Sequence, residues 1–160
     1  MKYNILAFSK SLRKESHTTK LVKAFQKSAP KGIIVDIINI SILPFINEDL
    51  ENDLPQSVKD LHKKIKKADV ILFAIPEYNR SYSPVLKNAI DWGSRPEVNN
   101  MWNKKSTGVI GCSPYRHGGF GAINHLRQVL LYVNTYTMQQ REFYLEEIAD
   151  VMDKEGNINN

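Results

Sequence analysis

The sequence predicts an α/β protein in which a five-stranded parallel sheet, with strand order 2-1-3-4-5, lies between two layers of helices. Short apolar runs alternate along the chain with segments whose apolar residues recur at helical spacing. The run at 70–75 is apolar at every position, which is typical of a central parallel strand covered on both faces. The chain has 160 residues, 42% of them hydrophobic, which corresponds to one domain spanning residues 1–160. Since crossovers between parallel strands are right-handed, few other strand orders remain.

Each element has its own local signals. The predicted strands are 3–8, 33–38, 70–75, 106–112 and 135–138, the last with a continuation at 143–144. The predicted helices are 18–28, 55–67, 84–93 and 122–134. Ser16 has the N-cap position of the first helix, and Ser83 followed by Pro84 is a strong start signal for the third. We expect Leu21, Val22 and Phe25 to form the apolar face of the first helix.

Charge and composition exclude several classes of function. The net charge of +5 comes from 22 Lys and Arg spread over the chain, without the dense basic stripe of a nucleic-acid binder. A solvated Lys-rich surface explains this charge, and modest steering of anionic ligands is the alternative. No apolar run approaches the roughly 20 residues of a membrane span, and the N-terminal apolar segment is too short for a signal peptide. The single cysteine, Cys112, cannot form an internal disulfide, so we expect a cytoplasmic protein.

Three polar loops follow predicted strands one, three and four, and we expect them to meet at the carboxyl edge of the sheet. The first loop, 9–18, carries four serine and threonine hydroxyls and Arg13, and it leads into a helix. Backbone N–H groups at a helix start and an Arg side chain suit a phosphate group. A capped helix start with solvated lysines is the alternative, and neither common Gly-rich nucleotide motif is present.

The other two loops favour a flat ligand. In the loop 76–81, Tyr78 can stack or hydrogen-bond, and in the loop 113–121 glycines permit a positive φ and the close approach of a ring. Either loop considered alone is equally explained as a plain turn. Their coincidence with the first loop at one sheet edge is what favours a ligand site.

Four motifs resemble the NADPH-dependent FMN reductase family, which includes small quinone, azo-dye and chromate reductases. They are Ser9-x-Ser11-Leu12-Arg13-x-x-Ser16, Pro76-Glu77-Tyr78-Asn79, Leu86-Lys87-Asn88-Ala89-Ile90-Asp91-Trp92-x-Ser94-Arg95 and His125-Leu126-Arg127-Gln128-Val129-Leu130. The second and third are highly specific together, and the resemblance spans roughly residues 1–155. It implies a flavodoxin-like three-layer fold, bound FMN and a homodimer or homotetramer.

The resemblance also implies which residues bind the cofactor. Those at the phosphate group are Ser9, Ser11, Arg13, Ser16, His17 and Thr18, and those near the isoalloxazine ring and ribityl chain are Pro76, Glu77, Tyr78 and Asn79. Arg80 is a further candidate for a phosphate of FMN or NADPH, with Arg116 after it. Ser113, Gly118 and Gly119 have the positions of the third flavin loop.

The implied activity is that of an NAD(P)H-dependent oxidoreductase. Hydride would pass from NADPH or NADH through N5 of FMN to a quinone, free flavin or similar small acceptor, with ping-pong kinetics. No catalytic side chain and no metal are required, because the cofactor carries the chemistry. One alternative is a flavodoxin-like electron carrier, although such carriers tend to be acidic. Another is a non-catalytic module, since Lys10, Glu15 and Thr18 replace the family's usual Gly, Gly and Asn.

Other residues indicate structural roles, or leave two alternative positions open. The histidines show no metal-ligand spacing, and the acidic stretch 48–53 suits a solvated loop better than a calcium site. Cys112 ends a buried strand, which favours inert packing over a nucleophile. Trp92 is expected in the core or at a subunit contact, and Trp102 beside the flavin or as a surface anchor. The outer face of helix 84–93 is a candidate subunit contact.

Overall fold

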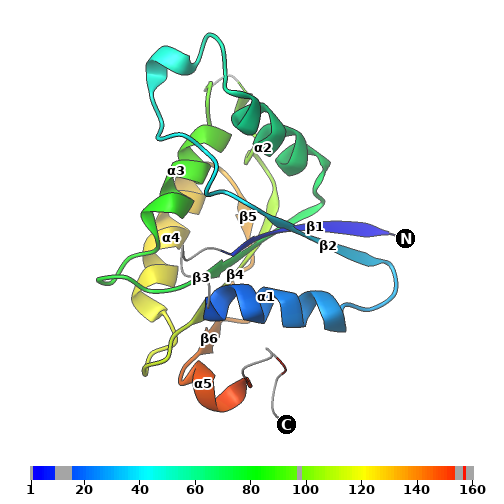
Figure 1. Cartoon of the computed structure of the whole chain (residues 1–160), viewed down its shortest axis with the longest axis vertical. Helices are drawn as coiled ribbons and strands as arrows, with labels where there is room; N and C mark the ends of the chain where they lie inside the picture. The colour runs from blue at the N-terminus through cyan, green and yellow to red at the C-terminus, as the bar shows by residue number, and fades with distance from the viewer. Residues whose placement is uncertain (1, 10–15, 97–98, 154–156, 158–160) are drawn as a thin grey trace.

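The computed structural model describes residues 2–9, 16–96, 99–153 and 157, and its sheet has the predicted order β2-β1-β3-β4-β5 with parallel pairing throughout (Figure 1). The strands are β1 (Tyr3–Ser9), β2 (Ile33–Ile38), β3 (Val70–Ile75), β4 (Ser106–Cys112), β5 (Tyr136–Thr137) and β6 (Phe143–Leu145). The helices are α1 (His17–Ser28), α2 (Gln56–Lys67), α3 (Pro84–Gly93), α4 (Phe120–Tyr132) and α5 (Ile148–Val151), with a 3₁₀ turn at Glu48–Leu50. The α/β prediction and its strand order are therefore confirmed.

The expected fifth strand is divided into two short pieces on the same side of β4. β5 pairs with the first two residues of β4, and β6 pairs with its last three, Ile110 to Cys112. The intervening residues 138–142 are exposed and, apart from Met138, polar or charged, so they gain little from a place in a sheet that is buried on its faces. The predicted continuation of the strand at 143–144 is confirmed, whereas β5 is shorter than the strand expected at 135–138.

Helix starts follow the predicted caps. Ser16 Oγ accepts a hydrogen bond from the Thr19 N–H at 3.4 Å, and Ser83 Oγ accepts one from the Leu86 N–H at 3.4 Å, with Pro84 in the first turn. The fourth helix begins two residues earlier than expected, because Gly119 has the left-handed φ of 87° at its N-cap. Among the described residues, no helix combines the length and the apolar character that crossing a bilayer requires.

The larger core lies on the side of the sheet covered by α2, α3 and α4. Large side chains of β1 and β3, among them Phe8, Ile71 and Phe73, are fully buried there. Trp92 is also buried in this core, which is one of the two positions expected for it. Its indole N–H donates to the Pro44 carbonyl at 2.8 Å. The other side of the sheet carries α1 and the short α5 (Figure 1).

Two sequence expectations about aromatic residues are wrong. Trp102 neither anchors the surface nor borders a ligand edge, because it is fully buried against Phe8 and Phe73 and its indole donates to the Ile90 carbonyl at 2.8 Å. Gly93 leaves the space for it, since a Cβ there would lie 2.4 Å from the Trp102 ring. Phe25 does not face the core, and Ala24 is buried in its place.

Candidate functional site

Three loops meet at the carboxyl edge of the sheet, as the topology predicts. β3 lies between β1 and β4, so the loops that leave these three strands are neighbours. The first loop is described only at its two ends, at Ser9 and from Ser16 onward. The predicted phosphate residues Ser11 and Arg13, and the departures Lys10 and Glu15, lie outside the described residues.

Buried hydroxyls are found at the end of β1, on Ser9, and at the start of α1, on Ser16 and Thr18. Ser9 is 3% exposed, and its Oγ has no hydrogen-bond partner among the described residues. Ser16 Oγ lies 2.8 Å from Thr18 Oγ1, and both side chains are buried at the helix N-terminus. A buried hydroxyl without a partner is unfavourable by about 1–3 kcal/mol, so Ser9 is ready to bind a ligand. The positive end of the α1 dipole makes an anionic ligand group the best match.

His17 and Thr18 differ in their relation to the buried hydroxyls at the helix start. His17 is the first residue of α1 and is half-buried, whereas Thr18 is 1% exposed and its hydroxyl contacts Ser16. The threonine that departs from the family pattern therefore belongs to the buried hydroxyl pair at the start of α1. It can position Ser16 as well as contact a ligand.

The loop after β3 is a tight and well-defined turn. The Tyr78 N–H donates to the Ser81 carbonyl at 2.7 Å, and the Ser81 N–H donates back to the Tyr78 carbonyl at 2.9 Å. Between them, Asn79 and Arg80 both have the left-handed backbone, with φ of 49° and 66°. Asn tolerates this conformation better than most residues. The turn leaves Tyr78 44% exposed at the sheet edge, where a planar ligand could stack on its ring.

Glu77 fastens this turn to α4. One carboxylate oxygen, Oε1, lies 3.0 Å from Arg80 Nη1, and the other, Oε2, accepts the Ala122 N–H at 3.2 Å. A carboxylate at a helix N-terminus is favoured by the helix dipole. Gly121 gives the side chain its room, because a Cβ there would lie 3.2 Å from a Glu77 carboxylate oxygen. The Glu77 side chain thus has internal partners, a role that its place in the motif did not reveal.

The glycines of the third loop have a structural reason of their own. Gly118 and Gly119 have positive φ values of 51° and 87°. A Cβ on Gly118 would lie 2.6 Å from the backbone of Tyr144, and a Cβ on Gly111 would lie 2.3 Å from the Gly118 carbonyl oxygen. The loop therefore packs directly on β4 and β6, which places its backbone at the sheet edge. Ser113 begins the loop, and its Oγ accepts the Tyr115 N–H at 3.0 Å.

Sequence reasoning missed one contact beside the site, between Ser81 and His125. Ser81 Oγ lies 2.9 Å from His125 Nδ1, and the imidazole ring is 5.3 Å from the Tyr82 ring. Burial, with a smaller contribution from the charge of Asp91, raises the pKa of Tyr82 to about 12. His125 stands in one of the quoted motifs, but 44 residues separate it from Ser81 and no local pattern links the two.

Two other predicted residues have simple explanations. Arg116 is exposed, and its Nε lies 3.9 Å from a Glu147 carboxylate oxygen. Cys112 is buried at the end of β4 with Leu21 and Ile148, and burial raises the pKa of its thiol to about 12. The thiol therefore stays protonated at neutral pH, which supports the expected packing role.

Comparisons with known proteins agree with the geometry. The family model described as NADPH-dependent FMN reductase matches residues 3–150. A quinone reductase of Pseudomonas putida is 40% identical over 158 residues, covering 98% of this chain and 85% of the relative. An NADPH:quinone oxidoreductase of Arabidopsis thaliana is 40% identical over 164 residues, covering 96% and 81%. The solved structure of FerB, a flavoenzyme NAD(P)H:(acceptor) oxidoreductase of Paracoccus denitrificans, is 38% identical with a TM-score of 0.93, covering 99% of this chain and 87% of FerB.

Proposed function

Because the chain belongs to the NADPH-dependent FMN reductase family, whose members are oxidoreductases that use FMN and NAD(P)H, we propose that it reduces quinones with FMN bound at the carboxyl edge of its sheet. One observation supports the location: the hydroxyl of Ser9, at the end of β1, is buried and has no hydrogen-bond partner within the part of the chain that the structure describes. FMN held there would supply hydride transfer through its N5, and the proposed kinetics are ping-pong, because NADPH and the acceptor would use the same site in turn.

The phosphate group of FMN is assigned to the first loop. Its ligands are Ser9, Ser11, Arg13, Ser16, His17 and Thr18, of which Ser11 and Arg13 rest on the sequence motif alone. Ser9 offers a hydroxyl that has no described partner, and the start of α1 offers the positive end of a helix dipole. Together these groups compensate the charge that a phosphate brings into a partly buried site.

The flavin ring is assigned to the second and third loops. The residues beside it are Pro76, Glu77, Tyr78 and Asn79 from one side and Ser113, Gly118 and Gly119 from the other, and Arg80 is a candidate for a phosphate of FMN or NADPH. Tyr78 presents its exposed ring to orient the ligand. Glu77 acts through position, because its carboxylate holds the turn against α4 through Arg80 and the Ala122 N–H. No side chain is needed to donate or accept a proton during hydride transfer.

Acceptor, assembly and location belong to the same proposal. The acceptor is a quinone, with free flavin as a second substrate, because the most similar proteins reported above are quinone reductases or oxidoreductases. The active form is a homodimer or homotetramer that uses the outer face of α3, where Lys87 pairs with Asp91 at 2.6 Å. The exposed Tyr132 of α4 lines the same hollow as Lys87 and Asp91 and extends this surface. The free buried Cys112 fits a cytoplasmic protein.

The proposal is tested on the purified chain reconstituted with FMN. We expect the visible absorption of bound flavin and NADPH oxidation that depends on added 1,4-benzoquinone. Ser9→Ala should weaken FMN binding about tenfold, which is about 1.4 kcal/mol, because one hydroxyl partner of the phosphate is lost. The control Ser41→Ala changes an exposed serine in the loop after β2 and should leave FMN affinity unchanged. A chain that binds no FMN, or one that binds FMN without acceptor-dependent NADPH oxidation, contradicts the proposal.

A further inference from the structure

The turn at residues 78–81 is strained, so contacts outside the turn must hold it. Backbone hydrogen bonds of 2.7 and 2.9 Å between Tyr78 and Ser81 close it. Both central residues have a positive φ, 49° at Asn79 and 66° at Arg80, which is the pattern of a type I′ turn. Arg is unfavourable in this conformation, because it lacks both the freedom of Gly and the short polar side chain of Asn. Residues strained in this way persist where the surrounding structure restrains them.

α4 supplies a restraint at each end of the turn. At the first end, Glu77 Oε2 accepts the Ala122 N–H at 3.2 Å. At the other end, Ser81 Oγ lies 2.9 Å from His125 Nδ1. Ala122 and His125 are three positions apart, so they lie on the same side of the helix. The helix is a firm support, because its inner face is buried in the core.

The His125 ring is held by contacts with two neighbouring residues. It packs against the Tyr82 ring, with the ring centroids 5.3 Å apart and the planes tilted by 56°. Tyr82 is buried and belongs to the larger core. The bond to Ser81 forms with either tautomer of the imidazole, because a hydroxyl can donate to a ring nitrogen or accept from its N–H. His125 is therefore a fixed point for Ser81, although its own side chain is exposed.

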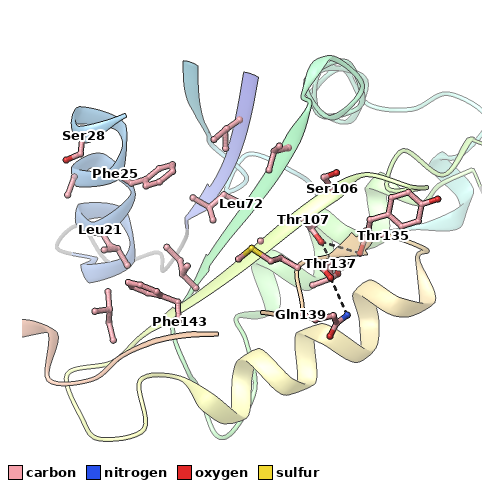
Figure 2. Close-up of a pocket in the computed structure, with 18 of the residues that line it drawn as sticks. Leu21, Phe25, Ser28, Leu72, Ser106, Thr107, Thr135, Thr137, Gln139 and Phe143 are labelled. Atoms are coloured by element: carbon pink, nitrogen blue, oxygen red, sulfur yellow. Dashed lines mark hydrogen bonds between the residues drawn. The ribbon is translucent and has the colours of Figure 1, made fainter. Parts of the chain in front are cut away.

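A polar hollow of about 570 Å³ between α3 and α4 lies beside this contact. His125 and Gln128 of α4 line it, together with Lys87 and Asp91 of α3. It differs from the larger apolar hollow on the α1 face, shown in Figure 2, which is lined by none of the described residues of the turn or of α4. Of these two hollows, the polar one therefore adjoins the turn, and Gln128 offers a control on the same helix.

We propose that His125 is a positioning residue for the flavin site, which acts through Ser81 to set the place of the Tyr78 ring. Two links transmit its effect: the Ser81 side chain is bonded to His125, and the Ser81 backbone is bonded to Tyr78. Without the first link the strained turn relaxes, and a smaller fraction of the chain is ready to bind FMN. The inference rests on the proposed function and adds to it a residue that acts from α4.

Four variants test the role of His125 in FMN binding. Ser81→Ala and His125→Phe each remove the hydrogen bond, and His125→Phe still places a ring against Tyr82. Each should weaken FMN binding about fivefold, which is the size expected for one such bond. The double variant should bind no more weakly than either single variant, because both remove the same contact. His125→Asn should recover most of the affinity, because its amide has a polar atom close to where Nδ1 lies.

Hydrogen exchange of the FMN-free chain provides a readout that does not depend on the cofactor. The Tyr78 N–H is bonded within the turn, so its exchange reports on opening of the turn. We expect NMR to show this exchange about fivefold faster in His125→Phe than in the unmodified chain, and close to the unmodified rate in His125→Asn. The control Gln128→Ala changes an exposed residue of the same hollow and should alter neither the exchange nor FMN affinity.

The outcomes separate this inference from the proposed function. An unmodified chain that binds no FMN contradicts the proposed function and the inference with it. If the unmodified chain binds FMN and His125→Phe binds it equally tightly, the proposed function stands and the positioning role is overturned. A lower melting temperature of His125→Phe with unchanged FMN affinity and Tyr78 exchange also overturns it, since the contact would then only stabilise the fold. So do additive losses in the double variant, because the two side chains would then act independently.

Discussion

The two faces of one sheet differ in how well they are buried, although the same strands form both. On the face under α2, α3 and α4, Ile71, Phe73 and Ile75 of β3 are at most 1% exposed. On the other face, Val70 and Leu72 of the same strand remain half-buried. The strand sequence is equally apolar at all these positions. The strand sequence therefore determines which side chains can be buried, and the helices that lie across the strand determine which of them are buried.

The largest expected effect comes from truncating neighbouring residues of β3 that face opposite sides. Ile71→Ala should lower the free energy of unfolding by about 2–5 kcal/mol, because it leaves a cavity in a closed core. Leu72→Ala should lower it by about 1 kcal/mol, because the side chain is already partly exposed. Urea denaturation of both variants measures the contrast. Equal losses would show that, in solution, the sheet face that carries α1 is as well covered as the face under α2, α3 and α4.

A second effect concerns Glu77, which ties the ligand edge to the covered face. Glu77→Ala should weaken FMN binding about tenfold, because the turn at residues 78–81 loses its connection to α4. Glu77→Gln should have a smaller effect, since the amide oxygen can still accept the Ala122 N–H while the pairing with Arg80 is lost. Titration of the apoprotein with FMN, followed by flavin fluorescence, measures both.

The control for Glu77 is Asp53→Ala, which removes an exposed ion pair between the loop before α2 and Lys59. It should leave FMN affinity unchanged. If Glu77→Ala binds FMN as tightly as the unmodified chain, the carboxylate only stabilises the local fold. In that case the thermal stability of the apoprotein would fall without any change in FMN affinity.

Helix caps on opposite faces provide a third, smaller comparison. Ser83→Ala at α3 and Ser16→Ala at α1 should each reduce stability by about 1 kcal/mol, because each removes one acceptor from a helix N-terminus. Only Ser16→Ala should also weaken FMN binding, since its hydroxyl belongs to the proposed phosphate site. Thermal unfolding and FMN titration separate the two effects. Weaker FMN binding in Ser83→Ala as well would argue against a specific role for Ser16.

The smallest effect is a loss of stability at alkaline pH, with one contributing group on each face. Burial raises the pKa of Cys112 on the α1 face from 9.0 to about 12, and that of Tyr82 on the other face from 10.0 to about 12. Both groups are neutral when protonated, so their contribution is complete below pH 9 and is lost between pH 9 and 12 as the unfolded chain ionises first. Cys112→Ala should flatten the fall in melting temperature from pH 9, and Tyr82→Phe from pH 10. Parallel curves for both variants and the unmodified chain would contradict this assignment.

Local signals predicted a large part of the fold. The strands Ile33–Ile38, Val70–Ile75 and Ser106–Cys112 have the expected bounds, as does the helix Pro84–Gly93. These segments combine a clear apolar pattern with strong terminal signals such as Ser83 and Pro84. The failures lie where a signal depends on distant contacts, as in the division of the fifth strand along β4.

The candidate site divides in the same way. The sequence placed polar loops after strands one, three and four, and the parallel topology brought them to one edge. It did not reveal that Glu77 contacts the start of α4 or that Ser81 contacts His125, because each contact joins residues more than 40 positions apart. Ser9 could be named as a ligand from its motif, but only the structure shows that its hydroxyl is buried and has no partner among the described residues.

By itself, the sequence determined the order of strands and helices, the parallel topology and the family, because periodicity, caps and short motifs are local properties of the chain. Only the tertiary structure decided that Trp102 fills the core above Gly93, that Phe25 is exposed, and that Val70 and Leu72 stay half-buried while their neighbours in β3 are fully buried. Burial depends on what lies across a strand as well as on the strand, and that neighbour comes from elsewhere in the polypeptide.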